Sequence, residues 1–262
     1  MTERYVQTLE RALDILEVLA RSEEYLGVTE IGNRIGLHKS TVHRILQTLC
    51  YRGYVEKEKD RERYHLGIKI VELGTRFFND LEIRKVAASF LGLLAKSFDE
   101  VVHLVLLDDG EVVYIDKRES SQLVGLHSKV GRRALMHCTA VGKAILSTLP
   151  EEEVRYILQT KGMPGFTYTT ITDPDRLMEQ LREIKRLGYA LEAEENEIGI
   201  LCLGTPIFDY SGRAIGAISV SGPVNRMKEK GTERIGEEIK RAGLEMSSKL
   251  GYAYYHDNNE SK

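Results

Sequence analysis

The fold of the first quarter of this chain is constrained most by the order of its expected elements, which is a helix, a glycine, a second helix and a hairpin. Ile31 and Ile35 mark the apolar side of a short helix that begins near a candidate cap, Thr29, and ends at Gly36. A second helix starts at Lys39, because apolar residues recur after it at helical spacing. The neighbouring elements that we expect are an amphipathic helix over Val6 to Arg21 and two short strands, Tyr54 to Lys57 and Arg63 to Leu66. This order predicts a winged helix-turn-helix.

The second helix of this motif lies in a segment without negative charge. No Asp or Glu occurs from Ile31 to Val55, although the chain of 262 residues has a formal net charge of −3. With its apolar stripe facing the core, the helix presents side chains that donate hydrogen bonds to phosphates or base edges. We expect DNA contacts from Lys39, Ser40, Thr41, His43, Arg44 and Gln47, and contacts to the DNA backbone from Arg61 and Arg63 of the hairpin. An ordinary solvated helix face is the alternative, which the charge gap and the order of elements disfavour.

The remainder of the chain predicts a second domain in which strands and helices alternate. The expected strands are Val101–Leu107, Glu111–Lys117, Leu123–His127, Gly199–Phe208 and Arg213–Ser221, and the expected helices are Gly67–Asp80, Ile83–Phe98, Thr139–Thr148, Pro150–Thr160, Pro174–Leu187 and about Glu233–Leu250. The turns DDG and DYSG each indicate a hairpin. We therefore expect an α+β protein of two domains, with the winged helix-turn-helix over residues 1–66, a linker helix over 67–82, an α/β domain over 83–252 and a disordered tail over 253–262.

The composition limits the class of protein. Hydrophobic residues make up 42% of the chain and charged residues 29%, as in a soluble globular protein. The three cysteines are scattered, which argues against a disulfide framework and for a reducing compartment. The N-terminus is charged and no apolar run reaches the roughly 20 residues that span a bilayer. We therefore expect a cytoplasmic protein that does not bind membranes.

Two long motifs resemble one protein family. The stretch VTEIGNRIGLHKSTVHRILQTLCYRGYVEKE, followed by YHLGIKIVELG, resembles the DNA-binding half of the IclR family of bacterial transcriptional regulators. The stretch GYALEAEENEIGILCLGTPIFDYSGRAIGAISVSGP resembles the signature of its C-terminal domain. The resemblance runs from about Val6 to Gly251 and implies a GAF-like effector-binding domain. It also implies repression relieved by a ligand as the commoner mode of action, with activation as an alternative. Family members usually have Asp or Ser where this chain has Glu192.

Side chains of two predicted strands are candidates for a ligand pocket in the second domain. Ile200 and Cys202 share one face of a strand, and Ser219 and Ser221 share a face of the next. Buried serines need hydrogen-bond partners, which a ligand supplies, although Cys202 and the two serines also suit a plain core. By resemblance to the family, the pocket comprises His127, Ala134, Ala140, Val141, Glu192, Ile200, Cys202, Ser219 and Ser221. The N–H groups of Ala140 and Val141 would start a helix and suit a carboxylate.

Glu192 narrows the class of ligand. A carboxylate beside an anionic ligand is repulsive unless it accepts a hydrogen bond from a hydroxyl group or is protonated. We therefore expect a small hydroxylated or keto acid from carbohydrate catabolism, such as a sugar-derived keto acid, in preference to an aromatic acid.

Enzymatic and metal chemistry are less well supported by the sequence. Neither Ser219 nor Ser221 lies in a G-x-S-x-G elbow, and TAVGKA lacks the residues of a phosphate loop, so we expect no enzyme. The side chains His103, His127, His137, Cys138 and Cys202 lack the spacing of a metal site. We expect no cofactor, and zinc is the metal that a His/Cys pocket would take. Arg132 and Arg133 are interpreted as surface charges.

A single helix-turn-helix contacts too few bases for genomic specificity, so we expect a homodimer, or a dimer of dimers forming a homotetramer, on a palindromic double-stranded operator. The apolar side chains Leu9, Leu13 and Leu16 of the first helix, with the linker helix, offer a dimer surface. A protein–protein adaptor would be the rival interpretation of the winged helix. It requires an exposed apolar face in place of Lys39 and Arg44.

Overall fold

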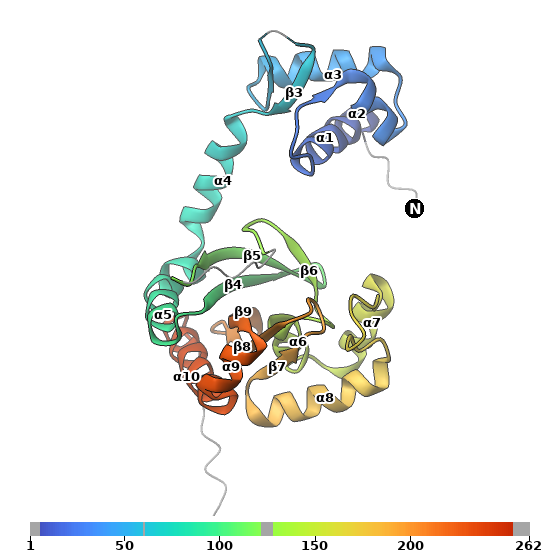
Figure 1. Ribbon diagram of the computed structural model, residues 1–262. Helices are drawn as coiled ribbons and strands as arrows, with labels where there is room; N and C mark the ends of the chain where they lie inside the picture. Colours follow the sequence, from blue (N-terminus) through green and yellow to red (C-terminus); the bar gives the residue numbers. More distant parts are fainter. Residues whose placement is uncertain (1–5, 60, 122–127, 254–262) are drawn as a thin grey trace, which may run out of the picture. The chain divides into compact units, whose positions relative to one another are not determined.

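The computed structural model describes residues 6–59, 61–121 and 128–253, and the chain divides into two compact units, Met1–Asp80 and Leu81–Lys262 (Figure 1). The first unit contains α1 (Gln7–Ala20), β1 (Leu26–Gly27), α2 (Val28–Ile35), α3 (Lys39–Tyr51), β2 (Val55–Lys57), β3 (Arg63–Leu66) and α4 (Lys69–Asp80). Its strands form a small antiparallel sheet in the order β1-β3-β2. The three helices followed by a β-hairpin confirm the winged helix-turn-helix.

Apolar side chains from α1, β1, α2, α3 and the hairpin form the core of this unit. It contains Ile15, Leu19, Leu26, Ile31, Val42, Ile45, Leu46, Val55 and Tyr64. β1 was not expected, because two residues are too short to show a strand pattern in the sequence.

The turn between α2 and α3 depends on two glycines. Gly36 ends α2 at a φ of 68°, a left-handed conformation that glycine adopts without strain. A Cβ at Gly32 would lie 2.7 Å from the carbonyl oxygen of Leu37, so the backbone of the turn packs closely against α2 at this point. The cap at the start of α2 differs from the expectation at Thr29. Gly27 is the N-cap, and its N–H donates to the Glu30 carboxylate at 2.7 Å, so Thr29 is inside the helix.

The second unit is built on a six-stranded antiparallel sheet. Its elements are α5 (Glu82–Phe98), β4 (Val101–Asp108), β5 (Glu111–Arg118), β6 (Arg133–Leu135), α6 (Ala140–Leu146), α7 (Glu151–Lys161), α8 (Pro174–Leu187), β7 (Ala190–Ala193), β8 (Ile200–Phe208), β9 (Ala214–Pro223), α9 (Val224–Lys230) and α10 (Thr232–Lys249). The strand order is β6-β5-β4-β9-β8-β7, and every pairing is antiparallel. Mixed helix and strand content in two units confirms the expected α+β class.

Three elements of this unit were missed, namely β6, β7 and α9, all of which are short. Pro150 is the N-cap of α7 and not its first helical residue. The expected strand Leu123–His127 lies outside the described residues, as does the tail from residue 254 onward. Asp173 caps α8 by accepting from the Arg176 N–H at 2.9 Å, and Gly188 ends the helix at a φ of 82°.

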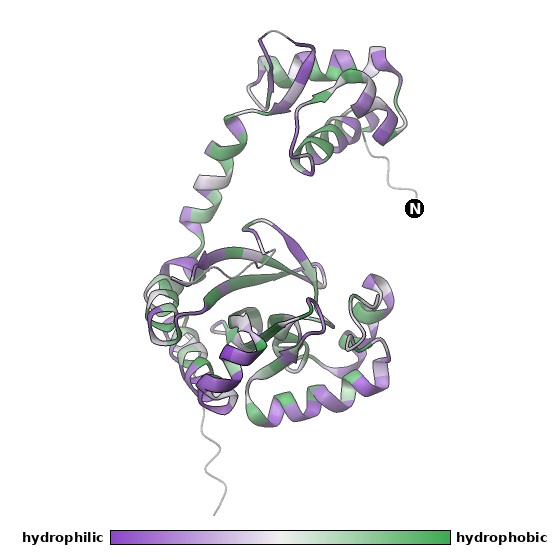
Figure 2. Ribbon diagram, in the orientation of Figure 1, coloured by the Kyte–Doolittle hydropathy of each residue, from purple (hydrophilic) through white to green (hydrophobic). Residues whose placement is uncertain are grey.

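Helices cover both faces of the sheet. A Cβ at Gly204 of β8 would lie 2.8 Å from the backbone of Ala140 in α6, whereas Thr205 of the same strand packs against Gly243 of α10. Adjacent residues of a strand point to opposite faces, so α6 and α10 lie on opposite sides. The strands are largely hydrophobic, and α8 has hydrophilic segments between hydrophobic ones (Figure 2). Among the described helices, none is long and apolar enough to cross a bilayer.

Candidate DNA-binding surface and effector pocket

One face of α3 is exposed and carries most of the side chains expected to contact DNA. Val42, Ile45 and Leu46 anchor the helix in the core, so the residues between them point outward. Lys39, Ser40, His43, Arg44 and Gln47 are exposed, whereas Thr41 is half-buried. Tyr51, at the last turn of the helix, is 89% exposed and extends the same element beyond the residues we expected. The arrangement of donors without a carboxylate on α3 is therefore present in the folded unit.

The hairpin differs from the expectation at Arg63. Arg63 is half-buried and forms an ion pair with Glu30 of α2 at 3.4 Å, so its guanidinium is already held within the protein. Only Arg61 of the expected pair is exposed. The hydrogen bond from Lys57, together with a smaller effect of His43, lowers the pKa of the Glu62 carboxyl, so a hairpin carboxylate lies within electrostatic range of α3. The absence of acids holds for the helix and not for the neighbouring hairpin.

A cavity of about 350 Å³ lies in the second unit, which suits a small ligand. Its lining comprises His103, Glu111, Tyr114, Ser128, Arg132, Arg133, Ala134, Leu135, Phe166, Glu192, Asn196, Glu197, Ile200, Cys202 and Ser221. Five of the expected pocket residues are among them: Ala134, Glu192, Ile200, Cys202 and Ser221. His127 lies outside the described residues.

Three expected pocket residues do not line this cavity. Ala140 and Val141 are 2% exposed and pack against β8, where a Cβ at Gly204 would lie 2.9 Å from the Val141 nitrogen. The first turn of α6 is thus closed off by the strand backbone. Ser219 is buried, and its Oγ lies 3.4 Å from Nδ1 of His103. Ser219 therefore supports a lining residue without reaching the cavity.

His103 is the centre of the polar wall on β4. Its Nε2 lies 2.8 Å from Oγ of Ser128, and its Nδ1 lies 3.4 Å from Oγ of Ser221. Burial, with a contribution from the charge of Lys117, lowers the pKa of His103 to about 3. The ring is therefore neutral, so one nitrogen donates and the other accepts. Tyr114 packs edge-on against it, with ring centroids 5.2 Å apart.

Glu192 is the central residue on the opposite side of the pocket. It pairs with Cys202 across β7 and β8, and Cys202 pairs with Ser221 across β8 and β9, which places three polar side chains in one row. Oε1 of Glu192 accepts the N–H of Glu195 at 2.6 Å and that of Asn196 at 3.3 Å. Burial raises the pKa of the Glu192 carboxyl to about 7 although these hydrogen bonds oppose the shift.

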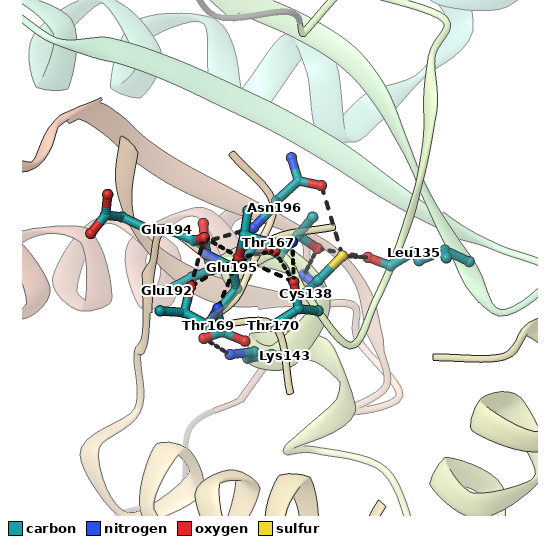
Figure 3. A network of polar contacts seen from close by, with 12 residues as sticks. Leu135, Cys138, Lys143, Thr167, Thr169, Thr170, Glu192, Glu194, Glu195 and Asn196 are labelled. Atoms are coloured by element: carbon teal, nitrogen blue, oxygen red, sulfur yellow. Dashed lines mark hydrogen bonds and ion pairs between the residues drawn. The ribbon is translucent and has the colours of Figure 1, made fainter. Parts of the chain in front are cut away.

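The turn after β7 is fixed by the network in Figure 3. Lys143 of α6 is fully buried and forms an ion pair with Glu195. The hydroxyl groups of Thr167 and Thr169 donate to the Glu194 carbonyl at 2.7 and 2.8 Å, and that of Thr170 donates to the Glu195 carbonyl at 2.6 Å. These contacts hold the backbone N–H groups that bind Glu192.

The described residues contain no cluster of three His, Cys, Asp or Glu side chains that would hold a metal ion, so we assign no metal ligands. His137 and Cys138 lie in a turn. The Nε2 of His137 lies 3.1 Å from the Pro164 carbonyl oxygen, and the Cys138 Sγ lies 3.8 Å from Oδ1 of Asn196. Burial raises the pKa of the Cys138 thiol to about 12, so this thiol is protonated.

Several lining residues could not be selected from the sequence. His103 reaches the pocket because β4 pairs with β9, with His103 opposite Ser219, and that pairing joins segments far apart in the chain. Arg132 and Arg133, interpreted as surface charges, do line the cavity. Arg133 is also paired with Asp108 and Glu111. The one local signal was the pair of adjacent arginines at the start of β6, a strand of three residues.

Comparison with known proteins identifies the family. The family model "Bacterial transcriptional regulator IclR C-terminal" matches residues 75–248, and "IclR helix-turn-helix domain" matches residues 8–59. The HTH-type transcriptional regulator XynR of Escherichia coli K12 is 35% identical over 94% of this chain and 98% of its own length. KdgR of the same organism is 33% identical over 95% of each chain, and the transcriptional repressor IclR is 31% identical over 94% of this chain and 90% of its own.

Solved structures agree with this result. The crystal structure of the Thermotoga maritima IclR matches with a TM-score of 0.78 and 35% identity, over 95% of this chain and all of that chain. An IclR homolog from Microbacterium hydrocarbonoxydans, complexed with 4-hydroxybenzoate, matches with a TM-score of 0.82 and 25% identity, over 93% of this chain and 98% of that one. These relatives are regulators and not enzymes. The chain belongs to the IclR family of bacterial transcriptional regulators.

Proposed function

We propose that this protein is a repressor that binds a palindromic operator as a homodimer or dimer of dimers, and that a small hydroxylated or keto acid in the pocket releases it. The exposed face of α3 carries the first part of this proposal, because Lys39, His43 and Arg44 present cations and hydrogen-bond donors in the position that enters the major groove. The names of two relatives, "Transcriptional repressor IclR" and "HTH-type transcriptional repressor AllR", favour repression over activation.

The pocket supports the class of ligand. A cavity of about 350 Å³ suits a short acid. Arg132 and Arg133 supply positive charge for a carboxylate, while His103, Ser221 and Glu192 offer hydrogen-bonding partners for hydroxyl or keto groups. The relative bound to 4-hydroxybenzoate shows that a fold of this kind accepts an aromatic hydroxy acid, so that class is the alternative.

DNA binding is tested by its dependence on salt. Duplexes enriched from a random pool by the full-length protein would be titrated by fluorescence anisotropy at several salt concentrations. Arg44→Ala and Lys39→Ala should each weaken binding and reduce the magnitude of the log–log salt slope by about 1 for every phosphate that the protein no longer neutralises. Arg21→Ala is the matched control, because Arg21 is exposed at the end of α1 and pairs with Glu17. Slopes that are unchanged in both α3 variants would contradict the proposed DNA-binding face.

Ligand binding is tested by thermal shift of the full-length protein with D-gluconate, pyruvate, 4-hydroxybenzoate and benzoate. A bound ligand raises the melting temperature by mass action. We expect D-gluconate or pyruvate to give the larger shifts and Glu192→Ala to bind them more weakly. If benzoate binds best, or if Glu192→Ala binds the hydroxylated acids as tightly as the unaltered protein, the ligand class is wrong.

A further inference from the structure

The pocket holds more acid than base, although the proposed ligand is an anion. Its lining contains three carboxyl groups, Glu111, Glu192 and Glu197, and two guanidinium groups, Arg132 and Arg133. Arg133 is already paired with Asp108 and Glu111. An anion that enters this lining meets a net negative charge if all three carboxyl groups are ionised, and like charges in a buried site repel strongly.

Glu192 is the carboxyl group that lacks a counter-charge. It is 2% exposed, and no Lys, Arg or His of the described part of the chain forms an ion pair with it. The buried cation beside it, Lys143, is bonded to Glu195 instead (Figure 3). Two carboxyl groups, those of Glu192 and Glu195, therefore lie beside one cation, Lys143. The ion pair of Lys143 with Glu195 has no net charge, so the charge of Glu192 is not balanced.

The backbone hydrogen bonds of Glu192 reach only one of its two carboxyl oxygens. Both backbone N–H groups, those of Glu195 and Asn196, donate to Oε1. The Cys202 thiol lies within hydrogen-bonding range of the carboxyl group. The other titratable or charged groups around this site are Tyr114 on β5, His103 on β4, Cys138 and Lys143 at α6, Glu195 and Glu197 in the turn after β7, and Arg132 and Arg133 at β6.

We propose that the pocket binds its acid ligand together with one proton, which is held on Glu192, so that ligand affinity is highest below neutral pH. This inference rests on the proposed function, since it concerns the same ligand. The protonated carboxyl removes the repulsion and donates a hydrogen bond to a hydroxyl or keto oxygen of the ligand, with the proton taken from solvent. The raised pKa of Glu192, about 7 because of burial, agrees with a proton that is exchanged in the physiological range.

The coupling is measured by calorimetric titration of the full-length protein with D-gluconate, pyruvate and 4-hydroxybenzoate, which stay ionised above pH 6. With a pKa of about 7 for Glu192, affinity should fall roughly tenfold between pH 6 and pH 8. Buffers of different ionisation heat should show uptake of about one proton per ligand at the higher pH. Glu192→Gln should bind with an affinity that is independent of pH and without proton uptake. Glu153→Gln, an exposed change on α7, should behave like the unaltered protein.

Two results would overturn the inference. One is an affinity that is constant with pH in the unaltered protein, and the other is the same pH dependence in Glu192→Gln. Infrared difference spectra of the free protein against Glu192→Gln provide a test that needs no ligand. A protonated carboxyl band at pH 6 that is lost by pH 8 is the expected result, and an ionised Glu192 at pH 6 contradicts the proposal. Failure of all three acids to bind would contradict the proposed ligand class, while the infrared band still decides where the proton resides.

Discussion

The ion pair between Lys143 and Glu195 gives a prediction whose size follows from its burial. Lys143 is 0% exposed and Glu195 is 5% exposed, so neither charge is stabilised by bulk water. Within the described structure, Oε2 of Glu195 has no hydrogen-bond partner. Removing the lysine leaves a buried carboxylate with no compensation. Lys143→Met should therefore lower the free energy of unfolding of the second unit by about 3–5 kcal/mol.

The double variant Lys143→Met, Glu195→Met separates charge from packing. Replacing both partners of a buried pair with apolar side chains is often neutral or stabilising, so the double variant should regain most of the loss.

Urea denaturation of the full-length protein, followed by circular dichroism, measures these differences. Hydrogen exchange of peptides from β8 and β9 reports on the second unit specifically, since the chain has two units that need not unfold together. A loss below about 1 kcal/mol in Lys143→Met would refute the reasoning, since a broken buried pair should cost several times that. A double variant as unstable as the single one would mean that the side chains matter for their shape and not for their charges.

Two further predictions concern the stability of the same unit. Gly142→Ala should destabilise this unit by about 1–3 kcal/mol or more, because the added Cβ would lie 2.3 Å from Cα of Met136. Gly92→Ala, on the open face of α5, should be neutral or stabilising by up to about 1 kcal/mol. Urea denaturation of the two variants measures both changes. Burial raises the pKa of the Glu192 carboxyl from 4.5 to about 7, so the folded state binds a proton at this group more tightly than the unfolded state does. The stability that comes from this proton is present below pH 4.5 and is lost as pH rises from about 4.5 to about 7. Relative to Glu192→Gln, the unaltered protein should lose on the order of 3 kcal/mol over that range, and equal pH profiles of the two proteins would contradict the assignment.

Local patterns in the sequence predicted the elements that have clear local signals. Gly36 ends a helix as expected, and the hairpin strand Arg63–Leu66 has the expected bounds. β6 and β7, of three and four residues, were missed because neither lies beside a turn that indicated a hairpin, as Arg63–Leu66 does. These two strands form because the longer strands β5 and β8 provide their backbone hydrogen-bond partners. The sequence of a short segment does not show which distant strand will pair with it.

The pocket shows the same division between local and long-range information. Three lining residues were selected from the sequence, namely Glu192, Cys202 and Ser221. Cys202 shares a strand face with Ile200, Ser221 shares one with Ser219, and all three belong to the stretch that resembles the family signature. Ala140 and Val141 do not line the cavity, because Gly204 lets the strand backbone pack onto the start of α6, and the sequence does not show this contact. His103 was set aside as a metal ligand without the right spacing, yet it lines the pocket through a pairing between β4 and β9.

A second buried acid shows why the surroundings of Glu192 point to a ligand. Glu100 is 0% exposed, and its carboxylate accepts from Arg226 at 2.5 and 2.7 Å and from Lys230 at 2.6 Å. Two cations compensate its burial, as a purely structural carboxylate requires. Glu192 is buried almost as deeply and has backbone N–H groups in place of cations. Since the fold can surround a buried acid with positive charge at Glu100, the lack of such compensation beside the cavity is best explained by a proton and a ligand that complete the site.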